Sequence, residues 1–504
     1  MGDVLANLFN PLSLAVIAGC TLYGTFVGAM PGLTATMAVA LLVPFTYFMN
    51  PLLAISAIVA TTSTAIFAGD IPGALMRIPG TPASAAYVED AYRLSSSGRA
   101  RSTLMVSLFS ASIGGLVGVT LLAIIAPQLA RIAIRFSSFE TFWLASLGLT
   151  CAVLTSNGSV PKSFASLFLG LFIASIGIDV AVGHPRFTFG NYELLNGVSF
   201  IPAIIGLFAL SEILRGAHAG GRAEQVVQAG EPLADALRAA GHTLRRFRRN
   251  MVRSSVLGTL IGALPGAGAD IAAWICYALS KRFSRQPERY GQGYIEGIVD
   301  GGSANNAAIG GAWTPALVFG IPGDSVTAVA IGVLLLNGLS PGPHIFTDSP
   351  ELVHTLYGAF ALTNLIMIPA GLLVIMAASH VLRIPRPVLM PIVLLFSLVG
   401  AYAITGSSMA IWTVLALGVL GYWMEANDFP LAPAILGLVL GRIVEDNFMT
   451  SMMKAQGDLL AFFSRPWAAA LGTLTLMIWA LLLIRAVRES RRHRSPSSTS
   501  DTGT

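Results

Sequence analysis

Two proline-glycine pairs lie inside long apolar segments, where each interrupts a helix and frees backbone groups for binding. They are Pro31-Gly32 and Pro265-Gly266. Proline removes one helical hydrogen bond and clashes with the preceding turn, at a cost of about 3 kcal/mol, and glycine permits a change of direction. Within lipid, such a break is tolerated only where protein or a polar cavity satisfies the freed groups. The N-terminus of a half-helix suits a carboxylate and unwound carbonyls suit Na⁺, so the sequence predicts a site for an anion and a coupling cation.

Hydroxyl, amide and carboxylate side chains follow the breaks and could line such a site. For any one of them, a helix cap or an interhelical hydrogen bond explains the residue as well as a ligand does. The glycines spaced by four residues before each break are also explained by close helix packing. With these alternatives open, the predicted substrate-binding residues are Gly28, Pro31, Gly32, Thr34, Pro79, Gly80, Thr81, Ser84, Gly262, Pro265, Gly266, Asp270, Asn305, Asn306, Pro322, Gly323, Asp324 and Ser325.

Four ionisable residues lie at membrane depth, where charge is costly and a function is the default expectation. They are Asp70, Arg77, Asp270 and Asp300. Asp270 is the best placed, because it follows the second Pro-Gly pair. Arg77 is either a counter-charge for an anionic substrate or a side chain that snorkels to the headgroups. The histidines and the three cysteines are dispersed along the chain, so the sequence predicts no metal site, no cofactor and no catalytic residue.

Membrane-spanning helices must position these residues. The 504-residue chain is 54% hydrophobic and only 11% charged, whereas a soluble domain averages roughly 25% charged residues. Apolar stretches of about 18 residues or more, the length that crosses a bilayer as helix, predict an all-α polytopic protein with about 12 transmembrane helices. The expected spans lie near Leu12–Met30, Thr34–Met49, Leu52–Ala68, Leu104–Ala126, Thr141–Thr155, Phe164–Ile178, Phe200–Leu214, Val256–Leu279, Ala307–Val318, Val326–Leu339, Leu356–Ala378, Val388–Ile404, Met409–Met424 and Trp467–Ile484.

Basic residues divide the chain. The stretch 215–253 contains five arginines between residues 238 and 249, and the positive-inside rule places it in the cytoplasm. We therefore predict a first transmembrane repeat over 1–214, a basic cytoplasmic linker over 215–253, a second repeat over 254–485, and a disordered basic and Ser/Thr-rich tail over 486–504. The net charge of +5 arises at membrane edges and does not indicate nucleic-acid binding.

The predicted repeats share two motifs. Gly24–Gly32 matches Gly258–Gly266, with apolar residues replacing apolar ones at every mismatch. Ile-Pro-Gly then recurs at Ile78 and at Ile321, each time with another proline seven residues before its own proline, at Pro72 and Pro315. Chance seldom produces such a pair of matches, so the sequence predicts an internal duplication.

The two copies are expected to have opposite orientations. The first is entered from an N-terminus without Lys or Arg, and the second from the basic linker, as in transporters built from inverted repeats. Lys281, Arg282 and Arg285 place more positive charge just beyond the span that the linker opens. Either that segment re-enters the membrane, or the charge bias fails locally.

The order of the motifs resembles that of one transporter family. They are GTFVGAMPGL, IPGTPASAA, GTLIGALPGAGADIAAWICYALSKRFS, SANNAA, FGIPG and the GLSPGP of Gly338–Pro343. With these motifs the sequence is similar to the large membrane subunit of the tripartite tricarboxylate transporters. The resemblance implies a multi-pass permease of the bacterial inner membrane that imports citrate-like di- or tricarboxylates with Na⁺ or H⁺. It also implies two partners, a small membrane subunit and a periplasmic solute-binding protein.

The chain departs from the family pattern in two places. Pro-Glu usually stands shortly before the family's Ala-Asn-Asn-Ala, and here Gly301-Gly302 takes its place. The family's Asp-Gly-Tyr is Asp90-Ala91-Tyr92 in this chain. Any coupling role of the missing glutamate would pass to Asp300 or Glu296.

Two other function classes fit the sequence less well. An intramembrane enzyme would need a nucleophile with a base, but Gly323–Thr327 does not match G-x-S-x-G and no H-E-x-x-H occurs. A carboxylate channel would need rings of like residues along a pore, which two broken helices do not suggest. A phosphate-binding P-loop is also absent from the sequence. Energy for transport is therefore expected to come from an ion gradient or from another subunit.

Overall fold

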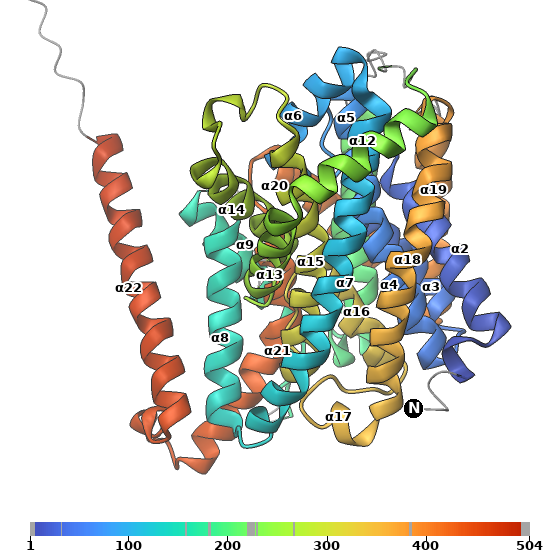
Figure 1. Ribbon diagram of the computed structural model, residues 1–504. Coiled ribbons are helices and arrows are strands. Elements are labelled where there is room, and N and C mark those ends of the chain that lie inside the picture. The colour runs from blue at the N-terminus through green and yellow to red at the C-terminus, as the bar shows by residue number, and fades with distance from the viewer. Residues whose placement is uncertain are drawn as a thin grey trace, which may run out of the picture.

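The computed structural model describes residues 6–31, 33–156, 159–179, 183–218, 227, 230–265, 268–382 and 386–494. These residues form a helical bundle (Figure 1), in which the short strands β1 (Gly177–Ile178) and β2 (Pro185–Arg186) pair antiparallel. The prediction of an all-α polytopic membrane protein is confirmed. Five helical segments are long and apolar enough to cross a membrane, namely Pro11–Gly28, Pro51–Met76, Val88–Ala133, Pro350–Ala378 and Ser408–Ala426. Shorter apolar helices of 10–17 residues accompany them, and the total of about twelve crossings stays a prediction.

The elements of the first half follow one another through short connections. They are α2 (Pro11–Gly28), α3 (Ala35–Thr46), α4 (Pro51–Ala68), α5 (Asp70–Met76), η1 (Ser84–Ala86), α6 (Val88–Leu94), the π-helix η2 (Ser95–Arg99), α7 (Ala100–Ala133), α8 (Ser138–Thr155), α9 (Val160–Ala174), η3 (Tyr192–Asn196), α10 (Phe200–Ile204), the π-helix η4 (Ile205–Leu210) and α11 (Ser211–His218).

The second half is also helical. Its elements are α12 (Leu233–Arg246), α13 (Arg248–Gly262), α14 (Gly268–Phe283), η5 (Pro287–Arg289), α15 (Ile295–Phe319), α16 (Ser325–Leu336), α17 (Ile345–Asp348), α18 (Pro350–Val381), α19 (Arg386–Thr405), α20 (Ser408–Ala426), α21 (Leu431–Lys454), η6 (Leu459–Phe463) and α22 (Pro466–Arg494).

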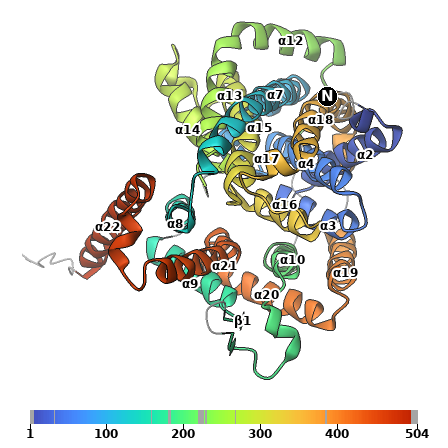
Figure 2. The ribbon, with the colours of Figure 1, turned by 90° about the horizontal axis from the view of Figure 1, so that it is seen from below.

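Helix α15 is the central element of the bundle. It is buried from Glu296 to Val318 and packs against α7, α13 and α14. Figure 2 shows α4, α7, α15 and α18 grouped together, with α8, α9, α21 and α22 to one side. Because α15 is surrounded by protein, its polar side chains can find partners that lipid does not offer.

Both Pro-Gly pairs separate one helix from the next. Helix α2 ends at Gly28, and Thr34 caps the start of α3 by accepting a hydrogen bond from the Met37 amide at 3.2 Å. Helix α13 ends at Gly262, and α14 begins at Gly268. The segment expected as one span over Val256–Leu279 is therefore two helices, because proline cannot continue the α13 hydrogen-bond ladder.

The two Ile-Pro-Gly segments also have similar surroundings. Helix α5 ends at Arg77 with φ of 61°, and α15 ends at Gly320 with φ of 67°. When Ile78 is aligned with Ile321, Arg77 and Gly320 occupy the same position. The following amides then bond back to matching prolines, Ile78 to the Pro72 carbonyl at 3.4 Å and Ile321 to the Pro315 carbonyl at 3.3 Å.

The glycine rows before the breaks allow two helix pairs to approach closely. A Cβ at Gly24 would lie 2.6 Å from the Thr61 carbonyl oxygen of α4, and one at Gly258 would lie 2.6 Å from the Ala304 carbonyl oxygen of α15. Gly28 and Gly262 contact the next turn of the same partners, at Ala65 and Ala308. Close helix packing, rather than substrate binding, accounts for Gly28 and Gly262.

The predicted basic linker over 215–253 contains helical segments. Helix α11 extends beyond residue 214, and α13 already begins at Arg248. Between them, α12 runs obliquely across α7 (Figure 1) and buries Ala236 and Ala240. These alanines lie four residues apart on one helical face, a signal that the high charge of the segment obscured.

Two other helices differ from the expected spans. Helix α21 was not predicted, because its apolar part ends at Gly441, before Arg442 and Glu445, and is shorter than a bilayer crossing. Helix α15 begins at Ile295, twelve residues before the expected start at Ala307, and carries Asp300 and Asn305 inside the helix. Hydropathy misses such helices when side-chain partners in the protein satisfy their polar residues.

Candidate functional site

The first Pro-Gly break meets the second Ile-Pro-Gly segment. Thr36, in the first turn of α3, is 8% exposed, and its hydroxyl oxygen lies 3.0 Å from that of Ser325 at the start of α16. Thr34 immediately precedes α3 and Asp324 immediately precedes α16. Residues from both halves of the chain therefore meet at one point.

The second Pro-Gly break approaches the same point. A Cβ at Gly268, the first residue of α14, would lie 2.7 Å from the Asp324 Cβ and 3.5 Å from the Gly323 carbonyl oxygen. Three helix N-termini, those of α3, α14 and α16, thus converge beside Asp324. We call this place, defined by Thr34, Thr36, Gly268, Asp324 and Ser325, the N-terminal junction.

The Asp324 carboxylate caps the start of its own helix, α16. Its Oδ1 accepts hydrogen bonds from the Thr327 amide and the Thr327 hydroxyl, both at 2.7 Å, while the Asp324 amide donates to Thr327 Oγ1 at 2.9 Å. This reciprocal cap is the alternative stated for the polar candidates. A ligand at the junction would therefore meet Thr36 and Ser325 rather than a free carboxylate.

The first Ile-Pro-Gly segment forms a separate group with a similar cap. The Thr81 amide donates to Ser84 Oγ at 3.2 Å, and the Ser84 amide donates to Thr81 Oγ1 at 3.1 Å. The Gly80 amide donates to the Gly69 carbonyl at 3.1 Å. Helix α14 reaches this segment too, because Trp274 Nε1 donates to the Pro82 carbonyl at 3.1 Å.

The two asparagines lie between these groups on α15. Asn305 Nδ2 donates to Tyr87 Oη at 3.3 Å, and Asn306 Nδ2 donates to the Ser63 carbonyl at 3.2 Å. The structure therefore places them in helix contacts rather than at the N-terminal junction. Neither asparagine Oδ1 has a hydrogen-bond partner among the described residues.

The remaining candidates have varied positions. Pro31 and Pro265 are half-buried beside the breaks, Pro79 is exposed, and Pro322 and Gly323 are buried behind the junction. Gly32, Gly266 and the side chain of Asp270 lie outside the described residues; Asp270 itself belongs to the first turns of α14.

The buried carboxylate of Asp70 lines a small cavity. Asp70 was not among the predicted substrate-binding residues. Tyr87 Oη donates to Asp70 Oδ1 at 2.8 Å, and Ser107 Oγ donates to Oδ2. Ser84 and Thr103 line the same cavity, and its other walls are apolar. The sequence singled out Asp70 as ionisable but held no signal that Tyr87 and Ser107 would face it, because these residues come from different helices.

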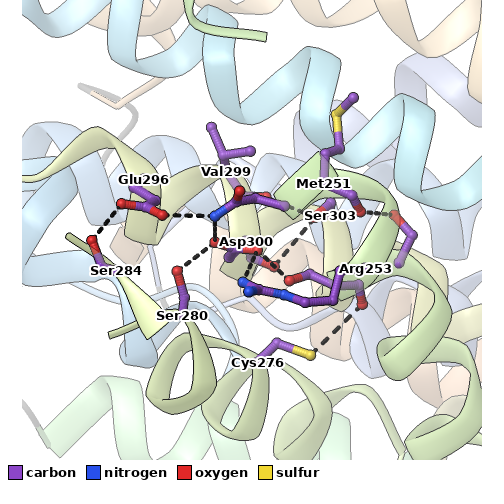
Figure 3. Close-up of polar contacts among 12 residues, drawn as sticks. Met251, Arg253, Cys276, Ser280, Ser284, Glu296, Val299, Asp300 and Ser303 are labelled. Atoms are coloured by element: carbon purple, nitrogen blue, oxygen red, sulfur yellow. Dashed lines mark hydrogen bonds and ion pairs between the residues drawn. The ribbon is translucent and has the colours of Figure 1, made fainter. Parts of the chain in front are cut away.

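A second buried carboxylate, Asp300, lies in a larger polar network (Figure 3). Its Oδ1 lies 3.1 Å from Arg253 Nη2 and also accepts from the Ser254 hydroxyl, and Oδ2 accepts from Ser280 and Asn250. These partners connect α13, α14 and α15. The ion pair with Arg253 gives Asp300 a structural role. From the sequence, Asp300 was a candidate for ion coupling.

Glu296, the other coupling candidate, lies one turn before Asp300. It accepts from Asn250 Nδ2 and from Ser284 Oγ, both at 2.7 Å. Figure 3 shows Glu296 and Asp300 on neighbouring turns of α15, with Ser284 and Ser280 below them in this view. Asp300 is therefore tied to α14, and Glu296 to the residue that follows the end of α14.

The N-terminal junction has the electrostatic character of an anion site. Each helix N-terminus carries roughly half a positive charge, and anions bind where backbone N–H groups and this dipole point at them. Here three such ends from distant parts of the chain meet beside two hydroxyl groups, and the Asp324 carboxylate already caps the end of α16. The arrangement can hold a carboxylate without a Lys or Arg side chain.

Comparison with known proteins is consistent with a transport function. Residues 14–436 match the model of the tripartite tricarboxylate transporter TctA family. An uncharacterised 52.8 kDa protein from the TAR-I ttuC′ 3′ region of Agrobacterium vitis is 31% identical over 498 residues, 97% of this chain and 98% of the relative. A second protein of that organism, from the TAR-II ttuC′ 3′ region, is 33% identical over 38% of this chain and 78% of the relative. No solved structure matches the chain.

The matched region runs from α2 into α21 and contains both Pro-Gly breaks and both Ile-Pro-Gly segments. The broken helices and the N-terminal junction are therefore features of the family region rather than of an appended domain. This membrane protein belongs to the tripartite tricarboxylate transporter TctA family and is a transporter permease.

Proposed function

We propose that the chain is the large permease subunit of a binding-protein-dependent secondary transporter in the bacterial inner membrane. It imports di- or tricarboxylates together with a cation, Na⁺ or H⁺. A periplasmic solute-binding protein delivers the substrate, and a small membrane subunit completes the complex. Membership of the TctA family supports this proposal, and the N-terminal junction is the structural observation that carries it.

The carboxylate binds at the N-terminal junction in this proposal. The hydroxyl groups of Thr36 and Ser325 lie 3.0 Å apart and can both turn to donate to the same oxyanion. Favourable interaction of an anion with one helix N-terminus contributes about 0.3–1 kcal/mol, and up to about 2 kcal/mol when partly buried. Because the Asp324 carboxylate already caps α16, the N-termini of α3 and α14 and the two hydroxyl groups are the features that would favour a carboxylate over a neutral molecule.

The proposed mechanism also includes an inverted internal duplication. Two observations support it: the matched glycine contacts of the α2–α4 and α13–α15 pairs, and the bond between Asn306 and Ser63. Aligning Ile78 with Ile321 places Ser63 opposite Asn306. Contact between matched positions is expected where two halves meet across a two-fold axis. Alternating access would then arise from movement of one half against the other.

Uptake of labelled citrate and other di- and tricarboxylates into proteoliposomes containing all three components tests the proposal. Replacing both Pro31-Gly32 and Pro265-Gly266 by Ala-Ala rejoins the half-helices and removes the N-termini of α3 and α14. We expect uptake to fall at least about a hundredfold, equivalent to about 2.7 kcal/mol. Unchanged uptake would contradict the assignment of the substrate site.

A matched control separates this effect from a general loss of helix prolines. Pro127 lies inside α7, away from both breaks, and Pro127→Ala should preserve uptake.

Thr36→Ala with Ser325→Ala should raise the KM about tenfold by removing two donors to the anion, without changing the amount of folded protein in the membrane. A fall in folded protein instead of the KM change would assign these hydroxyls to packing.

A further inference from the structure

The cavity beside Asp70 holds a buried carboxylate that, among the described residues, has neither a cation nor a backbone amide as a partner. Asp70 is 5% exposed, and none of the ion pairs formed by the described residues includes it. Within the described part of the chain, its two oxygens accept hydrogen bonds from the hydroxyl groups of Tyr87 and Ser107 and from no other group. A carboxylate charge here is offset by hydrogen bonds alone.

Three other buried carboxyl groups, Asp300, Glu140 and Asp90, have stronger compensation, whereas Glu296 is bound by the Asn250 amide and the Ser284 hydroxyl. Asp300 is paired with Arg253, and Glu140 with Arg465 at 3.1 Å. Asp90 accepts from the amides of Gly293 and Tyr294 at 2.7 and 2.9 Å and from Tyr277 Oη at 2.7 Å. Backbone amides and cations offset the charge of these carboxylates. Asp70 has neither.

The elements that pack against α5 bring no further charge to Asp70. Glu89 of α6 accepts from Arg77 and Arg93 near the surface, at 2.8 and 2.7 Å. Arg99 of η2 is exposed, and Arg101 of α7 donates to the Glu231 carbonyl. Tyr87 is the one titratable side chain that reaches Asp70, and α4 contributes none. An ionised Asp70 therefore needs a bound cation or must take up a proton, because an unpaired buried charge costs several kcal/mol.

We propose that Asp70 binds the coupling proton of the transporter. Its carboxylate takes one proton from water on one side of the membrane and releases it on the other, so the site alternates between charges of −1 and 0. In the ionised form Ser107 donates to Oδ2, and in the protonated form the same hydroxyl accepts the new O–H hydrogen. A proton needs only an oxygen of Asp70, whereas Na⁺ would also need hydroxyl groups of the cavity, such as those of Ser84 and Thr103, to turn toward it.

Hydrogen bonds connect the Asp70 cavity to the proposed substrate site. Gly69, which immediately precedes Asp70, accepts from the Gly80 amide, and Ser84 of that segment lines the cavity. Trp274 of α14 holds the same segment through the Pro82 carbonyl, and α14 begins at the N-terminal junction. A proton at Asp70 can thus bias the packing of α14, whose N-terminus would receive the carboxylate. This coupling rests on the proposed transport function, whereas proton binding by Asp70 does not.

A second observation supports a functional cavity. Asn305 is 2% exposed and donates to Tyr87 Oη, while its own Oδ1 has no partner among the described residues. Such an unpaired buried acceptor is unfavourable. The chain Asn305, Tyr87, Asp70 therefore contains a free acceptor that can accept a hydrogen bond when the site changes state.

Two measurements test the proposal, and the first does not depend on the substrate. Infrared pH titration of the purified permease should show a carboxyl band that converts between acid and carboxylate. Asp70→Asn should remove this band, and Glu89→Gln, a surface carboxyl on α6, should keep it. Identical spectra for wild type and Asp70→Asn would overturn the proton site.

The second measurement uses the three-component complex in proteoliposomes. An inward proton gradient should stimulate wild-type citrate uptake at least tenfold. Asp70→Asn should abolish the stimulation while retaining exchange of labelled for unlabelled citrate, and Glu89→Gln should keep both. Stimulation of Asp70→Asn by the proton gradient would contradict coupling through Asp70, and stimulation of wild type by a sodium gradient alone would overturn the choice of proton over Na⁺.

The outcomes separate this inference from the proposed function. A titrating band that is lost in Asp70→Asn, together with no uptake of any di- or tricarboxylate by the wild type, would reject the substrate assignment and retain the proton site. If Asp70→Asn does not fold, Tyr87→Phe keeps the volume of the site and removes one donor to the carboxylate. It should move the infrared transition to higher pH, and an unmoved transition would count against the assignment.

Discussion

Asp70 and Asp300 are both buried carboxylates in the centre of the bundle, but their surroundings differ in charge. Arg253 lies 3.1 Å from Asp300, and Ser254, Ser280 and Asn250 donate to it as well. Asp70 receives hydrogen bonds from two hydroxyl groups and from no cation. The first arrangement fixes a charge, and the second leaves the charge free to change.

This difference assigns the two sites separate roles. The Asp300 network connects α13, α14 and α15, so it maintains the scaffold around the second Pro-Gly break. The Asp70 cavity lies where α4 gives way to α5, beside the first Ile-Pro-Gly segment. Aligning the two Ile-Pro-Gly segments places Trp313 opposite Asp70, so the two halves differ in chemistry at this position.

The largest expected effect comes from removing the cation at Asp300. Arg253→Met leaves a carboxylate that is 0% exposed without its counter-charge. We expect the free energy of unfolding to fall by about 3 kcal/mol, measured by denaturant titration of the purified permease. Arg249→Met, an exposed position on the same helix, should change it by less than about 0.5 kcal/mol.

A double variant checks the cause of that loss. Arg253→Met with Asp300→Leu removes both charges and should recover much of the stability, because buried ion pairs are replaceable by apolar side chains. No recovery would show that Arg253 stabilises the helices through packing of its aliphatic stem rather than through Asp300.

A smaller effect is expected from exchanging each carboxylate for its isosteric amide. Asp300→Asn leaves Arg253 unpaired, but Arg253 is 35% exposed and water can solvate it. Asp70→Asn removes no ion pair. We therefore expect Asp300→Asn to lower the thermal unfolding midpoint more than Asp70→Asn does, with a difference of about 2 kcal/mol in stability. Equal losses of stability would contradict the different roles assigned to Asp70 and Asp300.

The smallest effect concerns the hydrogen bond from Tyr87 to Asp70. Loss of a bond to a neutral acid costs about 0.5–1.5 kcal/mol, whereas loss of a bond to a charged group costs about 1.5–3 kcal/mol. If Asp70 is protonated at rest, Tyr87→Phe should lower stability by about 1 kcal/mol at neutral pH. Tyr92→Phe changes a half-buried tyrosine on helix α6, which begins directly after Tyr87, and serves as the control. A loss near 3 kcal/mol would indicate a resting carboxylate.

Local signals predicted the interruptions of the helices well. Proline prevents continuation of a helix wherever it stands, so Pro31 and Pro265 marked the ends of α2 and α13 without knowledge of the fold. Length and hydropathy likewise revealed most apolar helices. They failed at α21 and at the start of α15, where Arg442 and Asp300 interrupt the apolar pattern. The structure explains Asp300 through its pair with Arg253.

These sequence signals could not predict which residues of the candidate sites contact one another. Thr36 and Ser325 are 289 residues apart, and their contact depends on how α3 packs against α16. Asp70 was recognisable as an ionisable residue in an apolar segment, but Ser107 and Asn305 resemble many other polar residues in the chain. Spacing along one helix predicts neighbours three and four residues away, and it does not predict neighbours on other helices.

The sequence by itself determined that the chain enters a membrane as helices, where those helices break, and which motifs recur. These properties follow from hydrophobicity and from the backbone chemistry of proline and glycine, which act locally. Only the tertiary structure decided that three helix N-termini converge at Ser325, that Asp300 has a cation and that Asp70 has none. The physical reason is that a charge or a dipole acquires its role from the groups within a few ångströms, and helix packing selects those groups.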